Sequence, residues 1–213
     1  MSLEMSTIYS KKDERINIHA IDGHFATVHS HITSYLDITT LKTRCSDARQ
    51  VADLMAKSYS TSTPVDTILC LDGMDVIGCY LSEKLTEVGI LSYNAHKTLY
   101  VIHPEYTTGG QIIFRDNYKI TLKGKNVLIL LGSVTTGGTL RTVMNTLAYY
   151  GATCTGVSAI FSAIEEIDGM PVNSIFGKED VPEYSSFTQN KCPLCKAKVP
   201  IQALVNSYGY AEL

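Results

Sequence analysis

The stretch from Val127 to Tyr150 constrains the fold of this chain more than any other. An apolar run, Val127–Leu131, precedes a loop of small residues, Gly132–Gly138, and a segment of mixed polarity, Thr139–Tyr150. Five consecutive apolar residues are typical of a strand covered on both faces, as in a parallel sheet. Apolar residues then recur at helix spacing, at Leu140, Val143, Met144 and Leu147. The stretch therefore predicts a buried strand, a loop and an amphipathic helix.

The loop in this unit has the composition of an anion-binding turn. Backbone N–H groups at a helix N-terminus lack helical partners, and the helix dipole favours an anion there. Gly137 and Gly138 would let a phosphate approach the backbone closely. Three hydroxyl donors lie beside them, those of Thr135, Thr136 and Thr139. The spacing alone is equally consistent with a phosphate cradle and with an ordinary strand-to-helix turn.

The Thr135–Thr139 segment, Thr-Thr-Gly-Gly-Thr, resembles a loop of the type I phosphoribosyltransferases. In that family the loop holds the 5′-phosphate of phosphoribosyl pyrophosphate (PRPP), and Mg²⁺ accompanies the substrate. Two acidic residues end the preceding strand and engage the ribose hydroxyls and the metal-bound sugar phosphate. Leu131 and Gly132 stand at those positions here. The resemblance implies a phosphate site at Thr135–Thr139 without the usual acidic pair.

A second segment of the resemblance follows the apolar run Val65–Leu71. Its residues are Asp72, Gly73, Met74 and Asp75. In the family the first core strand ends in such a loop, and the loop backbone contacts pyrophosphate. The alternative is a plain turn in which Asp75 is the N-cap of the next helix.

Arg115 and Lys119 match two basic positions of the orotate phosphoribosyltransferase branch of the family. The resemblance implies that both face pyrophosphate as catalytic residues. A short segment separates Lys119 from Val127, so the mobile loop that brings in a catalytic lysine in those enzymes is shortened here.

The N-terminal region is expected to form a hairpin. Ile16–Ile21 alternates, Asp22-Gly23 is a turn pattern, and His24–Tyr35 alternates again. The order of residues resembles the hood over the base in the orotate branch, at Phe25, Thr27, Ser30, His31, Tyr35, Leu41 and Lys42. His29 and His31 would share a strand face, which suits either a metal pair or plain polar residues.

The rest of the core alternates helices and strands. Helices are expected around Ala48–Met55 and Ile77–Val88, and strands at Ile90–Tyr93, Thr98–Ile102, Gln111–Arg115 and Thr153–Phe161. This alternation predicts an α/β fold, a doubly wound parallel sheet, with ligands at the carboxyl ends of the strands. We expect a hood segment over residues 1–43, a phosphoribosyltransferase-like core over 44–170 and a tail over 171–213.

The tail contains Cys192-Pro-Leu-Cys195, whose spacing suits a zinc knuckle. Two cysteines supply only two ligands, so zinc would need distant residues, such as a histidine of the hairpin, or a second subunit. A reduced structural turn and a redox pair are the alternatives. The following Val199–Tyr210 segment is expected to be a short amphipathic helix that docks on the core or on a dimer partner.

Composition limits the classes of function. The formal net charge of −3 and the absence of basic runs argue against nucleic acid and membrane surfaces as partners. Six scattered cysteines and an N-terminus without a signal-peptide pattern predict a reduced, cytoplasmic protein.

The resemblance implies a protein that binds PRPP or a nucleoside monophosphate as a homodimer. Its reaction would be Mg²⁺-dependent phosphoribosyl transfer to a pyrimidine such as orotate, which forms orotidine monophosphate and pyrophosphate. The alternatives are a catalytically inactive paralogue that senses PRPP or nucleotides and a zinc-stapled interaction protein.

Overall fold

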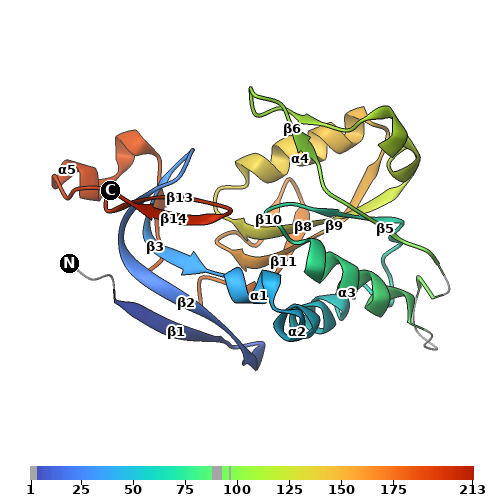
Figure 1. Cartoon of the computed structure of the whole chain (residues 1–213), viewed down its shortest axis with the longest axis horizontal. Helices are drawn as coiled ribbons and strands as arrows, with labels where there is room; N and C mark the ends of the chain where they lie inside the picture. The colour runs from blue at the N-terminus through green and yellow to red at the C-terminus, as the bar shows by residue number, and fades with distance from the viewer. Residues whose placement is uncertain (1–3, 88–92, 96) are drawn as a thin grey trace.

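The computed structural model describes residues 4–87, 93–95 and 97–213. Two large sheets lie side by side, a central one with helices on both faces and a second one that combines the two ends of the chain (Figure 1). The cavity described below lies where they meet. No helix in the described part of the chain is long and apolar enough to cross a membrane.

The central sheet confirms the predicted α/β fold. Its strands follow the order β10-β11-β9-β8-β4-β5, and every pair is parallel except β10 with β11. The strands are β4 (Thr67–Cys70), β5 (Tyr100–Ile102), β8 (Asn126–Val134), β9 (Thr153–Ser162), β10 (Glu166–Ile167) and β11 (Met170–Phe176). The sheet thus continues past residue 170, where the tail was expected to begin.

Helices cover both faces of this sheet because its strands are apolar on both sides. In β8, Leu128 and Leu130 share a core with the helices α2 (Cys45–Ala56) and α3 (Asp75–Thr86). Val127, Ile129 and Leu131 instead share a core with Leu140, Val143 and Leu147 of α4 (Gly138–Tyr149). Figure 1 shows α4 on one side of the sheet and α2 and α3 on the other. This is the doubly wound arrangement expected from the sequence.

The second sheet joins the N-terminal and C-terminal regions. Its order is β12-β3-β2-β13-β14, and β1 pairs with β2. The strands are β1 (Met5–Ser10), β2 (Asp13–Ala26), β3 (His31–Asp37), β12 (Ser186–Phe187), β13 (Ala203–Asn206) and β14 (Gly209–Glu212). The segment predicted to form a hood therefore shares one sheet with strands from the C-terminal end of the chain.

The predicted turn at Asp22-Gly23 is wrong. The long strand β2 passes through these residues with a bulge, since the pairing with β3 shifts register between Asp22 and Phe25. The side chain of Gln202 fills the space beside Gly23. The chain reverses instead at residues 27–30.

The predicted helix over Val199–Tyr210 is also wrong, because this segment forms the hairpin of β13 and β14. Ala203 and Val205 are buried while Leu204 and Asn206 are exposed, which is the alternation of a strand with one buried face. Gly209, which has a positive φ, begins β14 directly after the turn of this hairpin.

Short elements connect these layers. They are α1 (Thr39–Thr43), the paired strands β6 (Glu105–Tyr106) and β7 (Ile112–Ile113), the 3₁₀ helices η1 (Asp116–Thr121) and η2 (Gln189–Lys191), and α5 (Pro193–Lys196). The strand expected at Ile90–Tyr93 lies almost wholly outside the described residues.

Candidate functional site

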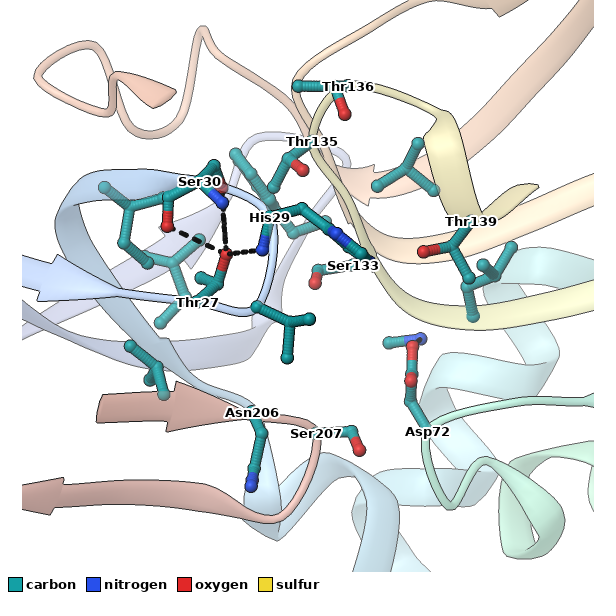
Figure 2. A pocket seen from close by; sticks show the side chains of 18 of the residues that line it. Thr27, His29, Ser30, Asp72, Ser133, Thr135, Thr136, Thr139, Asn206 and Ser207 are labelled. Atoms are coloured by element: carbon teal, nitrogen blue, oxygen red, sulfur yellow. Dashed lines mark hydrogen bonds between the residues drawn. The ribbon is translucent and has the colours of Figure 1, made fainter. Parts of the chain in front are cut away.

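A cavity of about 730 Å³ lies at the carboxyl ends of β4 and β8, between the two sheets. Four of the segments that line it are the predicted phosphate loop, Asp72, the 27–30 turn and the Asn206–Gly209 turn, beside residues of β3 and of the 38–42 segment. Figure 2 shows side chains from all four pointing into this space. The volume is within the range of pockets that hold small-molecule ligands. Parallel α/β sheets commonly bind ligands at this edge.

The predicted phosphate loop begins at Thr135, because β8 continues through Ser133 and Val134 in pairing with β9. Gly137 is the N-cap of α4 and has a φ of +78°, a conformation that favours glycine. No side chain caps this helix end. Its first N–H groups therefore keep hydrogen-bonding capacity for a ligand.

Three threonine hydroxyls belong to the same loop. In the part of the chain that the structure describes, the hydroxyls of Thr135, Thr136 and Thr139 have no hydrogen-bond partner. All three residues line the cavity, as do Gly137 and Gly138. The loop predicted from sequence thus presents unpaired donors to one space.

Asp72 supplies a carboxylate from the end of β4. Its Oδ2 accepts a hydrogen bond from the backbone N–H of Gly132 at 3.1 Å. A Cβ at Gly132 would lie 3.2 Å from the Asp72 Cβ and 2.9 Å from Ile38 Cδ1, so glycine leaves room for this contact. Burial raises the pKa of Asp72, while the Gly132 N–H and the charge of Lys42 oppose the change.

Lys42 links two walls of the cavity. Its Nζ donates to the backbone carbonyls of Asp72 at 2.8 Å and Ser207 at 2.9 Å. Burial lowers the pKa of Lys42, and the carboxylates of Asp72 and Asp37 oppose this. An ammonium has three donors, so one remains for a ligand.

The 27–30 turn forms the wall opposite the phosphate loop (Figure 2). Thr27 Oγ1 accepts hydrogen bonds from the N–H groups of His29 at 3.2 Å and Ser30 at 2.9 Å, and donates to the Ser30 carbonyl at 2.9 Å. The turn therefore has its own internal order. It presents Thr27, Val28, His29 and Ser30 to the cavity.

The other residues of the predicted pyrophosphate loop do not line the cavity. Met74 is fully buried, Gly73 is exposed, and an Asp75 carboxylate oxygen lies 3.1 Å from His103 Nδ1. Asp75 is the first residue of α3, and the N-cap of this helix is Met74. The alternative in which Asp75 is the N-cap is therefore wrong.

Arg115 and Lys119 also lie outside the cavity. Arg115 forms an exposed ion pair with Glu105, and Lys119 pairs with Asp116 at 2.8 Å. Lys119 borders a separate depression with Lys123 and Tyr149. Their catalytic role stays a prediction.

Several cavity residues were not identified from the sequence as site residues. Examples are Lys42, Tyr106 and Ser207, while His29, which was considered as a metal ligand with His31, lines the cavity instead. Lys42 entered only through the resemblance of the hood segment. Ser207 lies in the turn between β13 and β14, and Tyr106 lies in the short strand β6; the position of both depends on tertiary pairing, which no local pattern reveals.

The structure also brings together a group able to bind a metal ion, formed by His24, His31, Cys192 and Cys195. One potential ligand atom from each lies within 4.8 Å of the others. Three of the four residues are buried. The two cysteines predicted from sequence lie beside two histidines of the N-terminal strands, one of the two sources of further ligands that the sequence left open. The expectation that His29 and His31 share a strand face is wrong, because His29 lies in the turn between β2 and β3. The second histidine of the group is His24, which lies in β2.

Comparisons with known proteins agree with this architecture. No protein-family model matches the chain, and no curated protein matches its sequence. Among solved structures, adenine phosphoribosyltransferase from Thermoanaerobacter pseudethanolicus matches with a TM-score of 0.51 at 13% identity, over 81% of this chain and 95% of that one.

Two further structures match comparably. UMP synthase from Leishmania donovani gives a TM-score of 0.54 at 17% identity, over 76% of this chain and 34% of that longer one. Orotate phosphoribosyltransferase from Mycobacterium tuberculosis H37Rv gives 0.50 at 16% identity, over 78% and 93%. At these identities the likeness establishes the fold, which is that of the type I phosphoribosyltransferases.

Proposed function

We propose that this chain binds a phosphorylated ribosyl ligand, PRPP or a nucleoside monophosphate, with its 5′-phosphate on Thr135–Thr139. The observation that carries this proposal is the free N-terminal end of α4 beside three unpaired threonine hydroxyls in one cavity. Backbone N–H groups and hydroxyls at a helix N-terminus suit a phosphate. Lys42 adds a positive charge to the cavity lining next to Asp72, whose backbone carbonyl accepts a hydrogen bond from its ammonium group.

The reaction that we propose is Mg²⁺-dependent phosphoribosyl transfer from PRPP to a pyrimidine base, with orotate as the first candidate. Mg²⁺ is usually held by one or two carboxylates together with substrate phosphates. Asp72 is the one carboxylate among the described residues that line the cavity, so it is our candidate ligand. When bound, Mg²⁺ would offset phosphate charge. Arg115 and Lys119 stay candidates for contact with pyrophosphate.

A nucleotide or PRPP sensor without turnover is the second candidate. Leu131 and Gly132, in place of an acidic pair, favour it. A sensor would bind ligand with Mg²⁺ present and release no pyrophosphate, whereas an enzyme would release pyrophosphate in proportion to time and protein.

We also propose Zn²⁺ at Cys192 and Cys195, a homodimer and a cytoplasmic, reduced protein. Two thiolates with two imidazoles are a donor set typical of structural zinc. All six cysteines are free of disulfides. Light scattering of the purified chain tests the dimer.

Thermal unfolding with and without PRPP, orotate and orotidine monophosphate, each with Mg²⁺, tests the ligand class. A ligand at about 100 times its dissociation constant stabilises by about 2.7 kcal/mol, which is a measurable shift. A shift with PRPP or the nucleotide supports the proposal. The absence of a shift with all three ligands contradicts it.

A further inference from the structure

Four distances between ligand atoms of the His24–His31–Cys192–Cys195 cluster are close to the edge lengths of a zinc coordination tetrahedron. Zinc–nitrogen bonds of about 2.05 Å and zinc–sulfur bonds of about 2.3 Å place two nitrogens about 3.3 Å apart and a nitrogen and a sulfur about 3.6 Å apart. His24 Nε2 and His31 Nδ1 are 3.1 Å apart. The nitrogen–sulfur distances are 3.2 Å for His31–Cys195, 3.5 Å for His24–Cys192 and 3.6 Å for His24–Cys195.

The second nitrogen of His24 is already fixed by the tail. His24 Nδ1 lies 2.9 Å from the carbonyl oxygen of Val199, which fits donation of its proton to that oxygen. This bond leaves the lone pair of Nε2 toward the cluster. Metal-binding histidines usually make such a bond with their other nitrogen, which sets the tautomer and the ring orientation.

The tail segment that carries the cysteines has no apolar core of its own. Within residues 189–200, Cys192 is the one buried residue, and α5 buries none of its residues. Its neighbours include three exposed lysines and two exposed prolines. A segment without buried apolar surface needs another source of order, and a structural metal is a common one in small units.

The cluster also flanks one wall of the cavity. His24 lies near the end of β2 and His31 begins β3, so the two histidines bracket the 27–30 turn. On the tail side, the N–H and carbonyl of His24 bond to Gln202, and Ala203 pairs with Phe25 directly after it. The same hairpin then leads to Asn206 and Ser207 in the cavity wall.

We propose that His24, His31, Cys192 and Cys195 together bind one Zn²⁺, and that this ion holds the 27–30 and 206–209 turns in place as one wall of the ligand cavity. The two histidines complete the pair of cysteines with ligands from the opposite end of the chain. The zinc centre is independent of any ligand; its effect on ligand affinity rests on the proposed function.

The first test measures the metal in the purified full-length chain. We expect one zinc ion per chain by elemental analysis, and a visible absorption spectrum of tetrahedral Co²⁺ after exchange with cobalt. Cys195→Ser and His31→Ala should lose the metal, whereas Cys79→Ser, an exposed cysteine of α3 outside the cluster, should retain it. A wild-type chain that binds neither metal, or a Cys195→Ser chain that retains full zinc, overturns the proposal.

The second test asks whether the ion positions the wall. Hydrogen–deuterium exchange of the wild-type chain is compared before and after zinc is removed with a chelator. We expect exchange to rise about tenfold or more in peptides covering residues 24–34 and 199–210, with β8 unchanged. Equal exchange in both forms, with zinc shown to be bound and then removed, overturns the positioning role.

Ligand binding separates this inference from the proposed function. We expect inorganic phosphate to contact only the Thr135–Thr139 loop and the larger orotidine monophosphate to contact the 27–30 and 206–209 turns as well. We expect zinc removal to weaken binding of the nucleotide about tenfold or more and to leave binding of phosphate nearly unchanged. If neither probe binds the zinc-loaded chain while the first two tests succeed, the proposed function fails and the zinc centre stands. If the nucleotide binds equally with and without zinc, the effect on affinity is refuted.

Discussion

Gly137 and Gly138 are neighbours in the phosphate loop, and the structure predicts opposite effects when each is replaced by alanine. Gly137 has a φ of +78°, and a Cβ there would lie 2.7 Å from Ile167 Cδ1 and 3.1 Å from Ile164 Cδ1. Gly138 has no positive φ, and its nearest neighbour would be Thr136 Oγ1 at 3.9 Å, an ordinary contact. Gly138→Ala is therefore a matched control for Gly137→Ala.

The expected magnitudes follow from these geometries. A left-handed conformation costs a non-glycine residue about 1–2 kcal/mol. Displacing the ends of two isoleucine side chains adds a cost of about 1 kcal/mol. Alanine also lowers the conformational entropy of the unfolded chain, which stabilises the variant by about 0.4–1 kcal/mol and offsets part of the cost. Gly137→Ala should thus lower the free energy of unfolding by about 2 kcal/mol. Gly138→Ala should raise it by about 0.5 kcal/mol, because alanine favours the helix.

Thermal unfolding of the three proteins with zinc present measures the difference. A chain of this size changes its Tm by about 2–4 °C per kcal/mol, so Gly137→Ala should fall by about 4–8 °C and Gly138→Ala should rise by about 1–2 °C. Orotidine monophosphate should bind Gly138→Ala more weakly than wild type, since the added methyl group enters a loop that lines the cavity. Equal Tm values for the two variants would refute the loop conformation.

Three further predictions concern buried polar groups and one exposed pair. Burial raises the pKa of Asp72 above its usual value of 3.8, so the folded chain holds this proton more tightly than the unfolded chain. The free energy of unfolding of the wild-type chain should therefore fall, relative to that of Asp72→Asn, as pH rises from about 4 through the raised pKa, and the difference should level off above that pKa. Urea midpoints of both proteins between about pH 4 and about pH 7 measure this difference. A difference that stays constant over this pH range would contradict the prediction. Tyr59→Phe should destabilise the fold by about 1–3 kcal/mol, because the buried hydroxyl donates to the Val157 carbonyl at 2.7 Å and accepts from Asn173 Nδ2 at 3.0 Å. Urea unfolding measures the loss, with Tyr208→Phe, at an exposed tyrosine, as the control. Equal urea midpoints for the two variants would be the contrary result. Arg115→Ala should change the free energy of unfolding by less than about 1 kcal/mol, because the ion pair of Arg115 with Glu105 is exposed. A loss of pyrophosphate release in this folded variant would therefore indicate a role in the reaction. An unchanged rate of release would argue against a catalytic role.

The sequence predicted the central sheet because its signals are local. The apolar run of β8 and the helical spacing of α4 each lie within one continuous segment, and burial on both faces leaves few alternatives for Val127–Leu131. The same holds for α2, whose residues Ala48, Val51, Ala52 and Met55 are all buried as expected. Local periodicity therefore determined the layers and the edge at which the cavity lies.

The second sheet could not be predicted in the same way because its order depends on contacts between the chain ends. Asp22-Gly23 has the composition of a turn, but pairing of β2 with β3 on one side and β13 on the other keeps the strand continuous through it. The apolar residues of Val199–Tyr210 fit helical spacing as well as strand alternation. Long-range pairing of Ala203 with Phe25 selects the strand.

The acidic group of the cavity illustrates how a side chain can be supplied from a different strand. The sequence places Leu131 and Gly132 at the end of β8, so the carboxylates expected there by resemblance are missing. Asp72, at the end of the neighbouring strand β4, bonds to the N–H of Gly132 and occupies space that any larger residue at 132 would take. A side chain at 132 would crowd the Asp72 side chain, so glycine at 132 favours this close packing of the two strand ends. The sequence named Asp72 as part of the predicted pyrophosphate loop, but its position beside Gly132 depends on the ends of adjacent parallel strands meeting at one edge of the sheet, which a motif read along one strand does not show.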